Sequence, residues 1–243
     1  MSNLKDKAVL ITGGGSGIGL AAARLFLEQG ARVAITGRNP DKLRRAAESL
    51  GASRVLHHAA DIGDADQVRA LADRVLQAFG GLDVLVNNAG LNIKGRAVGA
   101  MTPESWQKVV RANLDGAFYC VHAFLPSMRQ RRQGLIININ SISGKRANPL
   151  GGIAYIAAKF GLTGMATSLA AEEKDNGIRV SSIFPGEANT PLLEARAQPV
   201  PEDLRQAMLQ PEDVAAAILF VAGLPAHVSI PEMVITPSNY AYI

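Results

Sequence analysis

The sequence is almost free of cysteine. Cys120 is the only one among 243 residues. An internal disulfide is therefore excluded, which suits a reducing compartment. The residues around Cys120 follow a helical pattern, and a single cysteine in such a pattern is typical of a small buried apolar side chain. We expect a core residue here rather than a reactive thiol.

Long apolar runs are also missing. No run approaches the ~18 residues that a membrane-spanning helix requires. The first residues, MSNLKDKAVLITGGG, lack the apolar region and cleavage site of a signal peptide. We expect a cytoplasmic protein that does not insert into a membrane.

The chain has little clustered charge, although it is basic overall. Its net charge is +4 and its isoelectric point is about 9.4. Lysine and arginine are scattered, and no long basic run is interleaved with aromatic residues, so nucleic-acid binding is disfavoured. The modest positive excess suits an anionic cofactor. His57 and His58 lack the spacing of metal ligands, and we expect no metal.

What the sequence does contain is an alternation of strand and helix patterns. Nearly continuous apolar runs predict buried strands at 7–12, 31–36, 53–59, 82–87, 135–140, 178–184 and 232–236. Helical patterns lie between them: from about Ile18 to Gln29, from Asp64 to near Gly80, from Thr102 toward Arg131, through Tyr155 and Lys159 to near Asn176, and from Pro211 to Gly223. Pro126 predicts a kink or break in the third of these helices.

This alternation predicts an α/β fold in one domain over residues 1–243. A hydrophobic content of 48% and a charged content of 19% are typical of a globular domain. Strand alternating with helix favours a parallel sheet with helices on both faces. Seven strands with right-handed crossovers indicate a doubly wound (Rossmann) sheet.

A glycine-rich turn, TGGGSGIG at 12–19, joins the first strand to the first helix. Such a turn directs backbone N–H groups and a helix N-terminus at one point, where a pyrophosphate fits. Side chains at Gly13, Gly17 and Gly19 would block its approach. A plain flexible turn is the alternative, but the position between a strand and a helix favours dinucleotide binding.

The end of the second strand bears on the choice of cofactor. An acidic residue there would bind the unphosphorylated ribose, whereas this chain has Gly37 followed by Arg38. A guanidinium can hold a 2′-phosphate. We predict NADP(H), with NAD(H) as the alternative if Arg38 is only an exposed loop residue.

Tyr155 and Lys159 stand one helical turn apart among small and apolar residues. Positions i and i+4 share one face of a helix. A free phenol has a pKa of about 10, and we expect the ammonium beside it to lower the pKa of Tyr155. The phenol could then give a proton to a carbonyl oxygen or accept one from an alcohol.

Several motifs occur together in a fixed order: TGGGSGIG at 12–19, Asp61 after the third strand, NNAG at 87–90, Asn113, Ser141, Y-x-x-x-K at 155–159 and PG-x-x-x-T at 185–190. With these motifs the chain resembles the short-chain dehydrogenase/reductase family from Lys7 to about Pro237. The resemblance implies hydride transfer between a nicotinamide cofactor and a carbonyl or secondary-alcohol substrate, with Tyr155 handling the proton on oxygen.

The resemblance also implies roles for individual residues. The catalytic set is Asn113, Ser141, Tyr155 and Lys159, with Ser143 as the alternative serine. Lys159 would also hold the nicotinamide ribose and relay protons through water near Asn113. The implied cofactor-binding residues are Gly13, Gly15, Ser16, Gly17, Ile18, Gly19, Arg38, Asp61, Ile62, Asn88, Ala89, Gly90, Tyr155, Lys159, Pro185, Gly186, Ala188 and Thr190.

Family members commonly form tetramers, so we expect a homo-oligomer, a tetramer or dimer, through the helices at 103–131 and 154–174. Residues 187–211 are expected to form a lid over the substrate. The C-terminal tail lacks the common T-G-Q-like turn and is interpreted as a surface, an oligomer contact or a wall of a partner's active site. A catalytically silent sensor or scaffold of the same fold is the competing hypothesis.

The loops that flank the expected cleft carry several cations: Lys94, Arg96, Lys145 and Arg146. They either favour an acidic substrate or are simply solvated.

Overall fold

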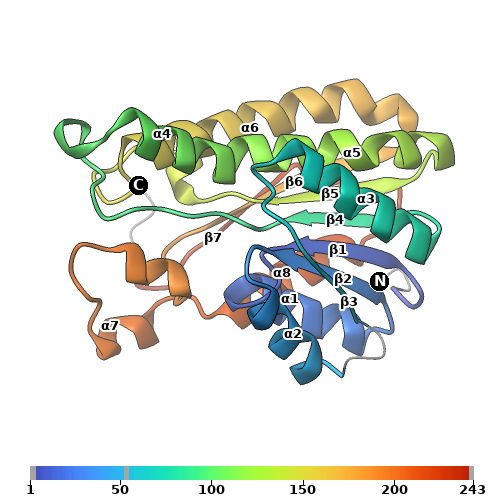
Figure 1. Cartoon of the computed structure of the whole chain (residues 1–243), viewed down its shortest axis with the longest axis horizontal. Coiled ribbons are helices and arrows are strands. Elements are labelled where there is room, and N and C mark those ends of the chain that lie inside the picture. Colours follow the sequence, from blue (N-terminus) through green and yellow to red (C-terminus); the bar gives the residue numbers. More distant parts are fainter. Residues whose placement is uncertain (1–3, 52–54, 241–243) are drawn as a thin grey trace.

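The computed structural model describes residues 4–51 and 55–240. Its centre is a seven-stranded sheet in the order β3-β2-β1-β4-β5-β6-β7, in which every paired strand is parallel (Figure 1). The strands are β1 (Ala8–Thr12), β2 (Arg32–Gly37), β3 (Val55–Ala59), β4 (Val84–Asn87), β5 (Gly134–Ile139), β6 (Ile178–Pro185) and β7 (Glu232–Ile235). All seven predicted strands are present, although the first residues of the one predicted at 53–59 lie outside the described residues.

Helices cover both faces of the sheet (Figure 1). One layer contains α1 (Gly17–Glu28), α2 (Pro40–Ser49) and α8 (Pro211–Ala222), and the other contains α3 (Ala65–Phe79), α4 (Pro103–Val110), α5 (Gly116–Arg131) and α6 (Ile153–Glu173). In β1, Val9 and Ile11 face the first layer, whereas Ala8 and Leu10 face the second. Burial on both faces explains why the strands are continuously apolar. The doubly wound fold is confirmed.

Two helices were not predicted. In α2 only Leu43, Ala46 and Ala47 are buried, so the helix is mostly polar, and its short amphipathic pattern was missed in the sequence. Its start does carry a local signal, because Asn39 Oδ1 accepts a hydrogen bond from the N–H of Lys42 at 2.9 Å and Pro40 follows directly. The second missed helix, α7 (Glu202–Ala207), is a short element with no buried residue.

Of the predicted kink or break at Pro126, the break is wrong. Helix α5 runs from Gly116 to Arg131 with Pro126 inside it. The irregular stretch lies earlier, in a π-helical segment, η3 (Arg111–Asp115), between α4 and α5. A wider π-turn is often associated with function, and this one carries Asn113.

The interior position predicted for Cys120 is confirmed. Its side chain is buried in α5 against the second core. Burial raises the pKa of the thiol to about 12, so the thiolate is disfavoured at neutral pH.

Helix α6 and the turn after it, Ile153–Asn176, are long and apolar enough to cross a membrane by length and composition alone. A core helix passes the same test. In this structure α6 buries Ala166 and Leu169 in the second core, and the packing of a sheet-covering helix accounts for its apolar character.

Candidate active site

A cavity of about 1370 Å³ lies at the carboxyl ends of the strands. Segments that follow β1 to β6 contribute to its walls, as expected for an open parallel sheet. The predicted site residues all belong to the described part of the chain, and all of them except Gly15 and Gly19 line this cavity. The structure therefore brings residues that are far apart in the sequence to one place.

The glycine-rich turn is tightly packed. Gly13 has a φ of +67°, and a Cβ at this position would lie 2.9 Å from Asn88 Nδ2. A Cβ on Gly19 would lie 2.5 Å from the carbonyl oxygen of Gly13. Gly19 thus allows α1 to approach the turn, which is a packing role.

The N-terminus of α1 differs from those of α2, α3 and α4. Asn39, Asp64 and Thr102 cap α2, α3 and α4 with their side chains. Within the described residues the side chain of Ser16 caps no N–H group of α1, and the first turn of α1 contains no acidic residue. The first N–H groups of α1 are thus left for an anion in the cavity.

The NNAG segment is fastened to the glycine-rich turn through Thr12. The hydroxyl of Thr12 accepts hydrogen bonds from the N–H groups of Asn88 and Ala89 at 3.0 and 2.9 Å. Asn88 Nδ2 in turn donates to the carbonyl oxygen of Thr12 at 2.8 Å. Sequence reasoning missed this function of Thr12, although the residue opens the TGGGSGIG motif.

Two cations lie at the β2 end of the cavity. Arg38 and Lys42 both line it and are exposed. The Cγ atom of Lys42 lies 3.5 Å from the position of a Cβ on Gly15, so its stem runs along the glycine-rich turn. Lys42 was missed in the sequence because helix α2, which carries it, was missed.

Asp61 combines two roles. Its Oδ1 accepts a hydrogen bond from the N–H of Gly63 at 3.0 Å, which stabilises the turn after β3. The residue also lines the cavity next to Ile62.

Tyr155 and Lys159 both face the cavity from α6. Lys159 is only 4% exposed. Its Nζ donates to the carbonyl oxygen of Ile139 at 2.9 Å and lies 5.6 Å from the centre of the Tyr155 ring. Burial lowers the pKa of Lys159 to about 8.

The expected lowering of the Tyr155 pKa by Lys159 is wrong for this structure. Burial raises the pKa of Tyr155 to about 12, and a hydrogen bond with Ser141 and the charge of Arg96 oppose that rise. The ammonium of Lys159 lies over the ring and bonds to β5, which explains why it has little effect on the phenol oxygen. The neighbours that act on that oxygen are a hydroxyl and a guanidinium.

The structure separates the two candidate serines. The side chain of Ser141 lies close enough to that of Tyr155 to lower the pKa of the phenol, and its Oγ accepts a hydrogen bond from the N–H of Ser143 at 3.1 Å. Ser143 is buried, with 6% of its surface exposed. Both line the cavity, but the contact with Tyr155 favours Ser141.

Asn113 presents an unused acceptor. Its Nδ2 donates to the carbonyl oxygens of Leu91 and Val109 at 2.7 and 2.8 Å. Among the described residues its buried Oδ1 has no partner. A Cβ on Gly90 would lie 2.6 Å from that oxygen, so Gly90 keeps the approach to it open. Such an acceptor suits a water molecule or a ligand donor.

The segment after β6 folds back over the cavity. Ala188 bridges to Leu209, and the N–H of Leu209 donates to the carbonyl oxygen of Glu187 at 3.0 Å. Between these contacts lie a 3₁₀ helix, Pro191–Ala195, and α7.

The C-terminal tail also reaches the cavity. Tyr240 lines it in its own chain, whereas we expected a surface, an oligomer contact or a partner's wall. Residues 241–243 lie outside the described residues. Of the four loop cations Lys94, Arg96, Lys145 and Arg146, all within the described ranges, only Arg96 lines the cavity.

Metal binding finds no support in the described part of the chain. No group of three or more histidine, cysteine, aspartate or glutamate residues there could hold a metal ion.

Comparison with known proteins gives consistent results. Residues 7–200 match the short chain dehydrogenase family. An uncharacterized oxidoreductase of Staphylococcus aureus is 35% identical over 237 residues, which are 98% of this chain and 100% of the relative. A 3-oxoacyl-[acyl-carrier-protein] reductase of Thermotoga maritima is 37% identical over 232 residues, which are 90% of this chain and 92% of the relative.

Among solved structures, a metagenomic short-chain oxidoreductase in complex with NADP superposes with a TM-score of 0.83 at 34% identity, over 98% of this chain and 100% of the other.

Proposed function

We propose, from the premise that this chain belongs to the short-chain dehydrogenase family and is one of its oxidoreductases, that it transfers a hydride between NADP(H) and a carbonyl or secondary-alcohol substrate. One observation carries the proposal: Tyr155, Ser141 and the buried ammonium of Lys159 line the same cavity, where the side chain of Ser141 lowers the pKa of the Tyr155 phenol.

The cavity fits a dinucleotide. The uncapped N-terminus of α1 and the side-chain-free turn at Gly13 suit a pyrophosphate. Asp61 and Ile62 would hold the adenine. The residues from Asn88 to Gly90 would pass beneath the cofactor, and Lys159 would hold the ribose of the nicotinamide. The nicotinamide would lie against the segment after β6, at Pro185, Gly186, Ala188 and Thr190, all of which line the cavity.

Phosphorylated cofactor is the preferred form in this proposal. Arg38 and Lys42 supply two cations at the β2 end, and β2 ends without an acidic residue. Ser16 occupies a position where NADP(H)-using family members often carry a basic residue. The positive charge of Lys42 takes the place of that missing basic residue. The NADP complex of a related oxidoreductase agrees with this preference. NAD(H) is the alternative.

Bound NADPH would supply the hydride to the substrate carbon. The hydroxyl of Ser141 would donate a hydrogen bond to the carbonyl oxygen, and Tyr155 would give that oxygen its proton. Arg96 supplies positive charge that stabilises the phenolate left behind. Asn113 Oδ1 and Lys159 would hold water that returns a proton to Tyr155.

A silent sensor or scaffold of the same fold is the competing function. It would need the cofactor site alone. The contact between Ser141 and Tyr155, together with Asn113 and Lys159 on the same cavity, favours an enzyme.

The assembly proposed is a homo-oligomer, a tetramer or dimer, in the cytoplasm. Large apolar side chains are exposed on α4, α5 and α6: Trp106, Phe118, Ile153 and Phe160. Exposed apolar patches of this kind mark protein contacts. In the same proposal the chain is one domain and residues 187–211 act as the lid.

The test is a panel of small ketones, each assayed with NADPH and with NADH by absorbance of the reduced nicotinamide. We expect turnover with NADPH to exceed turnover with NADH. Replacing Tyr155 with Phe should reduce kcat/KM about 10²–10⁴-fold, because the proton donor is lost. Cofactor binding, followed by fluorescence, should remain.

Undiminished turnover in Tyr155→Phe would refute the proposed proton donor. Cofactor binding without turnover on any ketone would favour the sensor.

A further inference from the structure

Arg96 reaches over the mouth of the cavity and joins three segments of the chain. Its Nε donates to the carbonyl oxygen of Ile93 at 2.6 Å, and its Nη1 donates to that of Leu150, in the loop before α6. Its Nη2 donates to the carbonyl oxygen of Ala195, in the segment after β6, at 2.9 Å. The guanidinium is thereby held in one place at the edge of the cavity.

The backbone around Arg96 is also fixed. Gly152, which precedes α6, has a φ of +75°, and a Cβ there would lie 2.4 Å from the Cβ of Arg96. Asn92 Nδ2 donates to the carbonyl oxygen of Gly151 at 2.9 Å. The loop that carries Arg96 therefore packs directly against the start of the helix that carries Tyr155.

The charge of Arg96 lacks a carboxylate partner. In the described part of the chain its hydrogen bonds all go to backbone carbonyl oxygens. Carbonyl groups satisfy N–H groups but do not neutralise a cation, and a guanidinium has further N–H groups to offer. Burial lowers the pKa of Arg96, as does the charge of Arg196, while Tyr155 raises it.

Arg196 is a second guanidinium on the same wall. It directly follows Ala195, whose carbonyl oxygen binds Arg96. Arg196 pairs with Glu187, at 2.8 Å between Nη2 and Oε1. Glu194 also lines this wall and is exposed. Two like charges at one partly buried place repel each other, and an anion between them would relieve that repulsion.

The cavity wall around Arg96 also carries apolar residues. Ile142, Leu150, Leu192 and Leu193 belong to the lining. A ligand that satisfies both kinds of group has an anionic end at the guanidinium groups and a small apolar body. Its reactive carbonyl must lie at Tyr155, whose phenolate form interacts with the charge of Arg96.

We propose that Arg96, assisted by Arg196, binds the carboxylate of an oxo-acid or hydroxy-acid substrate and thereby sets the substrate class of the enzyme. The inference rests on the proposed hydride transfer. In the reducing direction the carbonyl carbon accepts the hydride supplied by NADPH and the oxygen accepts the proton of Tyr155. The products are a hydroxy acid and NADP⁺, and the carboxylate is unchanged.

The experiment compares each acid with its neutral methyl ester. Pyruvate, acetoacetate and levulinate place the carbonyl successively one carbon further from the carboxylate, so they also measure the distance between Tyr155 and the guanidinium. For at least one pair we expect the wild-type kcat/KM to be about 10- to 100-fold higher for the acid, because a hydrogen bond to a charged group is lost in the ester.

Variants assign that preference to a residue. Arg96→Gln removes the charge and should reduce the acid-to-ester ratio about 10-fold or more. Arg96→Lys keeps the charge and should retain most of the ratio. Lys94→Gln, a cation of the same loop outside the cavity wall, should leave it unchanged. A purely structural role of Arg96 would lower both rates and leave the ratio as it is.

The outcomes separate this inference from the proposed function. If esters are reduced as well as acids, or Arg96→Gln leaves the ratio intact, substrate binding by Arg96 is wrong and the hydride transfer stands. If no compound is reduced, the hydride transfer loses its support, and calorimetry with levulinate tests carboxylate binding separately. A heat of binding in the wild type that Arg96→Gln abolishes supports the inference. The absence of a heat of binding overturns it.

Discussion

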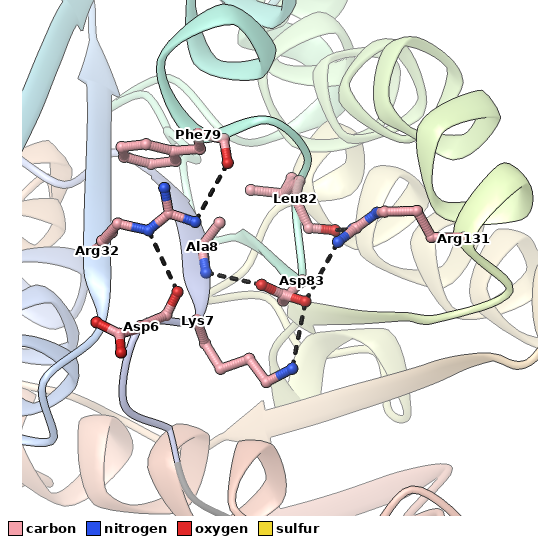
Figure 2. A network of polar contacts seen from close by, with 8 residues as sticks. All are labelled: Asp6, Lys7, Ala8, Arg32, Phe79, Leu82, Asp83 and Arg131. Atoms are coloured by element: carbon pink, nitrogen blue, oxygen red, sulfur yellow. Dashed lines mark hydrogen bonds and ion pairs between the residues drawn. The ribbon is translucent and has the colours of Figure 1, made fainter.

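Polar groups at the two ends of the parallel strands differ in whether they have hydrogen-bond partners. At the amino end, Asp83 lies just before β4, and its Oδ2 accepts the N–H of Ala8 at 2.8 Å (Figure 2). Its Oδ1 lies 3.4 Å from both Lys7 Nζ and Arg131 Nη1. Nearby, Arg32 donates to the carbonyl oxygens of Asp6 and Phe79, both at 3.2 Å. The carboxylate of Asp83 thus joins the start of β1, β4 and α5, while Arg32 of β2 bonds to backbone carbonyl oxygens.

At the carboxyl end, several buried polar side-chain atoms have no hydrogen-bond partner among the described residues. Among the described residues, the buried side-chain atoms without a partner belong to the carboxyl halves of β4 to β6, to the residue after β5 and to η3: Asn87 Oδ1, Asn113 Oδ1, Asn138 Nδ2, Asn140 Oδ1 and Ser182 Oγ. Lys159 is buried there with a backbone carbonyl as its partner, and Arg96 likewise bonds to carbonyls. Such groups cost stability unless water or a ligand meets them.

The difference teaches that stability and function are divided along the strands. The amino end holds the sheet together, and at the carboxyl end Asn113 and Asn140 bring unpartnered acceptors to the cavity wall. Changes at the carboxyl end should therefore affect turnover more than folding, and changes at the amino end should do the reverse.

The largest effect should come from the carboxyl end. Ser141→Ala removes the proposed donor to the carbonyl oxygen, and kcat/KM should fall about 10²–10³-fold. The thermal midpoint should stay close to that of the wild type. Ser143→Ala is the matched control and should retain most of the activity. A larger loss in Ser143→Ala would reverse the assignment of the two serines.

At the amino end the loss should be one of stability. Asp83→Ala leaves the N–H of Ala8 without its acceptor and two cations without their partner, which should reduce the free energy of unfolding by about 1–3 kcal/mol. Urea titration would measure it. Glu48→Ala, which breaks the exposed pair with Arg44, should cost less than about 1 kcal/mol. Equal losses in the two variants, or a changed kcat/KM in folded Asp83→Ala, would contradict the division.

The smallest expected effect is the contribution of Lys159 to the pH dependence of stability. Its pKa is lowered to about 8 in the folded chain, whereas an unfolded lysine titrates at about 10.4. Between these values the unfolded chain binds more protons, so this residue makes stability rise with pH from about 8 to 10. Lys159→Met should lack this rise.

The comparison of Lys159→Met with the wild type should be made by urea unfolding at intervals from pH 7 to 10. The variant should be the more stable at pH 7, and the difference should shrink by on the order of 1 kcal/mol as pH rises. A difference that does not change with pH would mean that the ammonium is well solvated.

The sequence alone determined the layered fold and the membership of the site. Continuous apolar runs mark strands buried on both faces, and parallel strands bring the residues after them to one edge of the sheet. Gly13 and Asn88 could be placed at one edge for this reason, whereas the resemblance to the family assigns Asn113 and Tyr155 to the site. Helix α2 and Lys42 were missed, although Leu43, Ala46 and Ala47 mark one apolar face in this mostly polar segment.

Only the tertiary structure decided the electrostatics of the site and which side chains surround the phenol oxygen of Tyr155. Spacing in the sequence put Lys159 beside Tyr155, but burial and a carbonyl of β5 direct its charge away from the phenol oxygen. The neighbours of that oxygen, Ser141 and Arg96, come from other loops. The strength of a charge depends on burial and on what surrounds it in space, and neither is written in the order of residues along a helix.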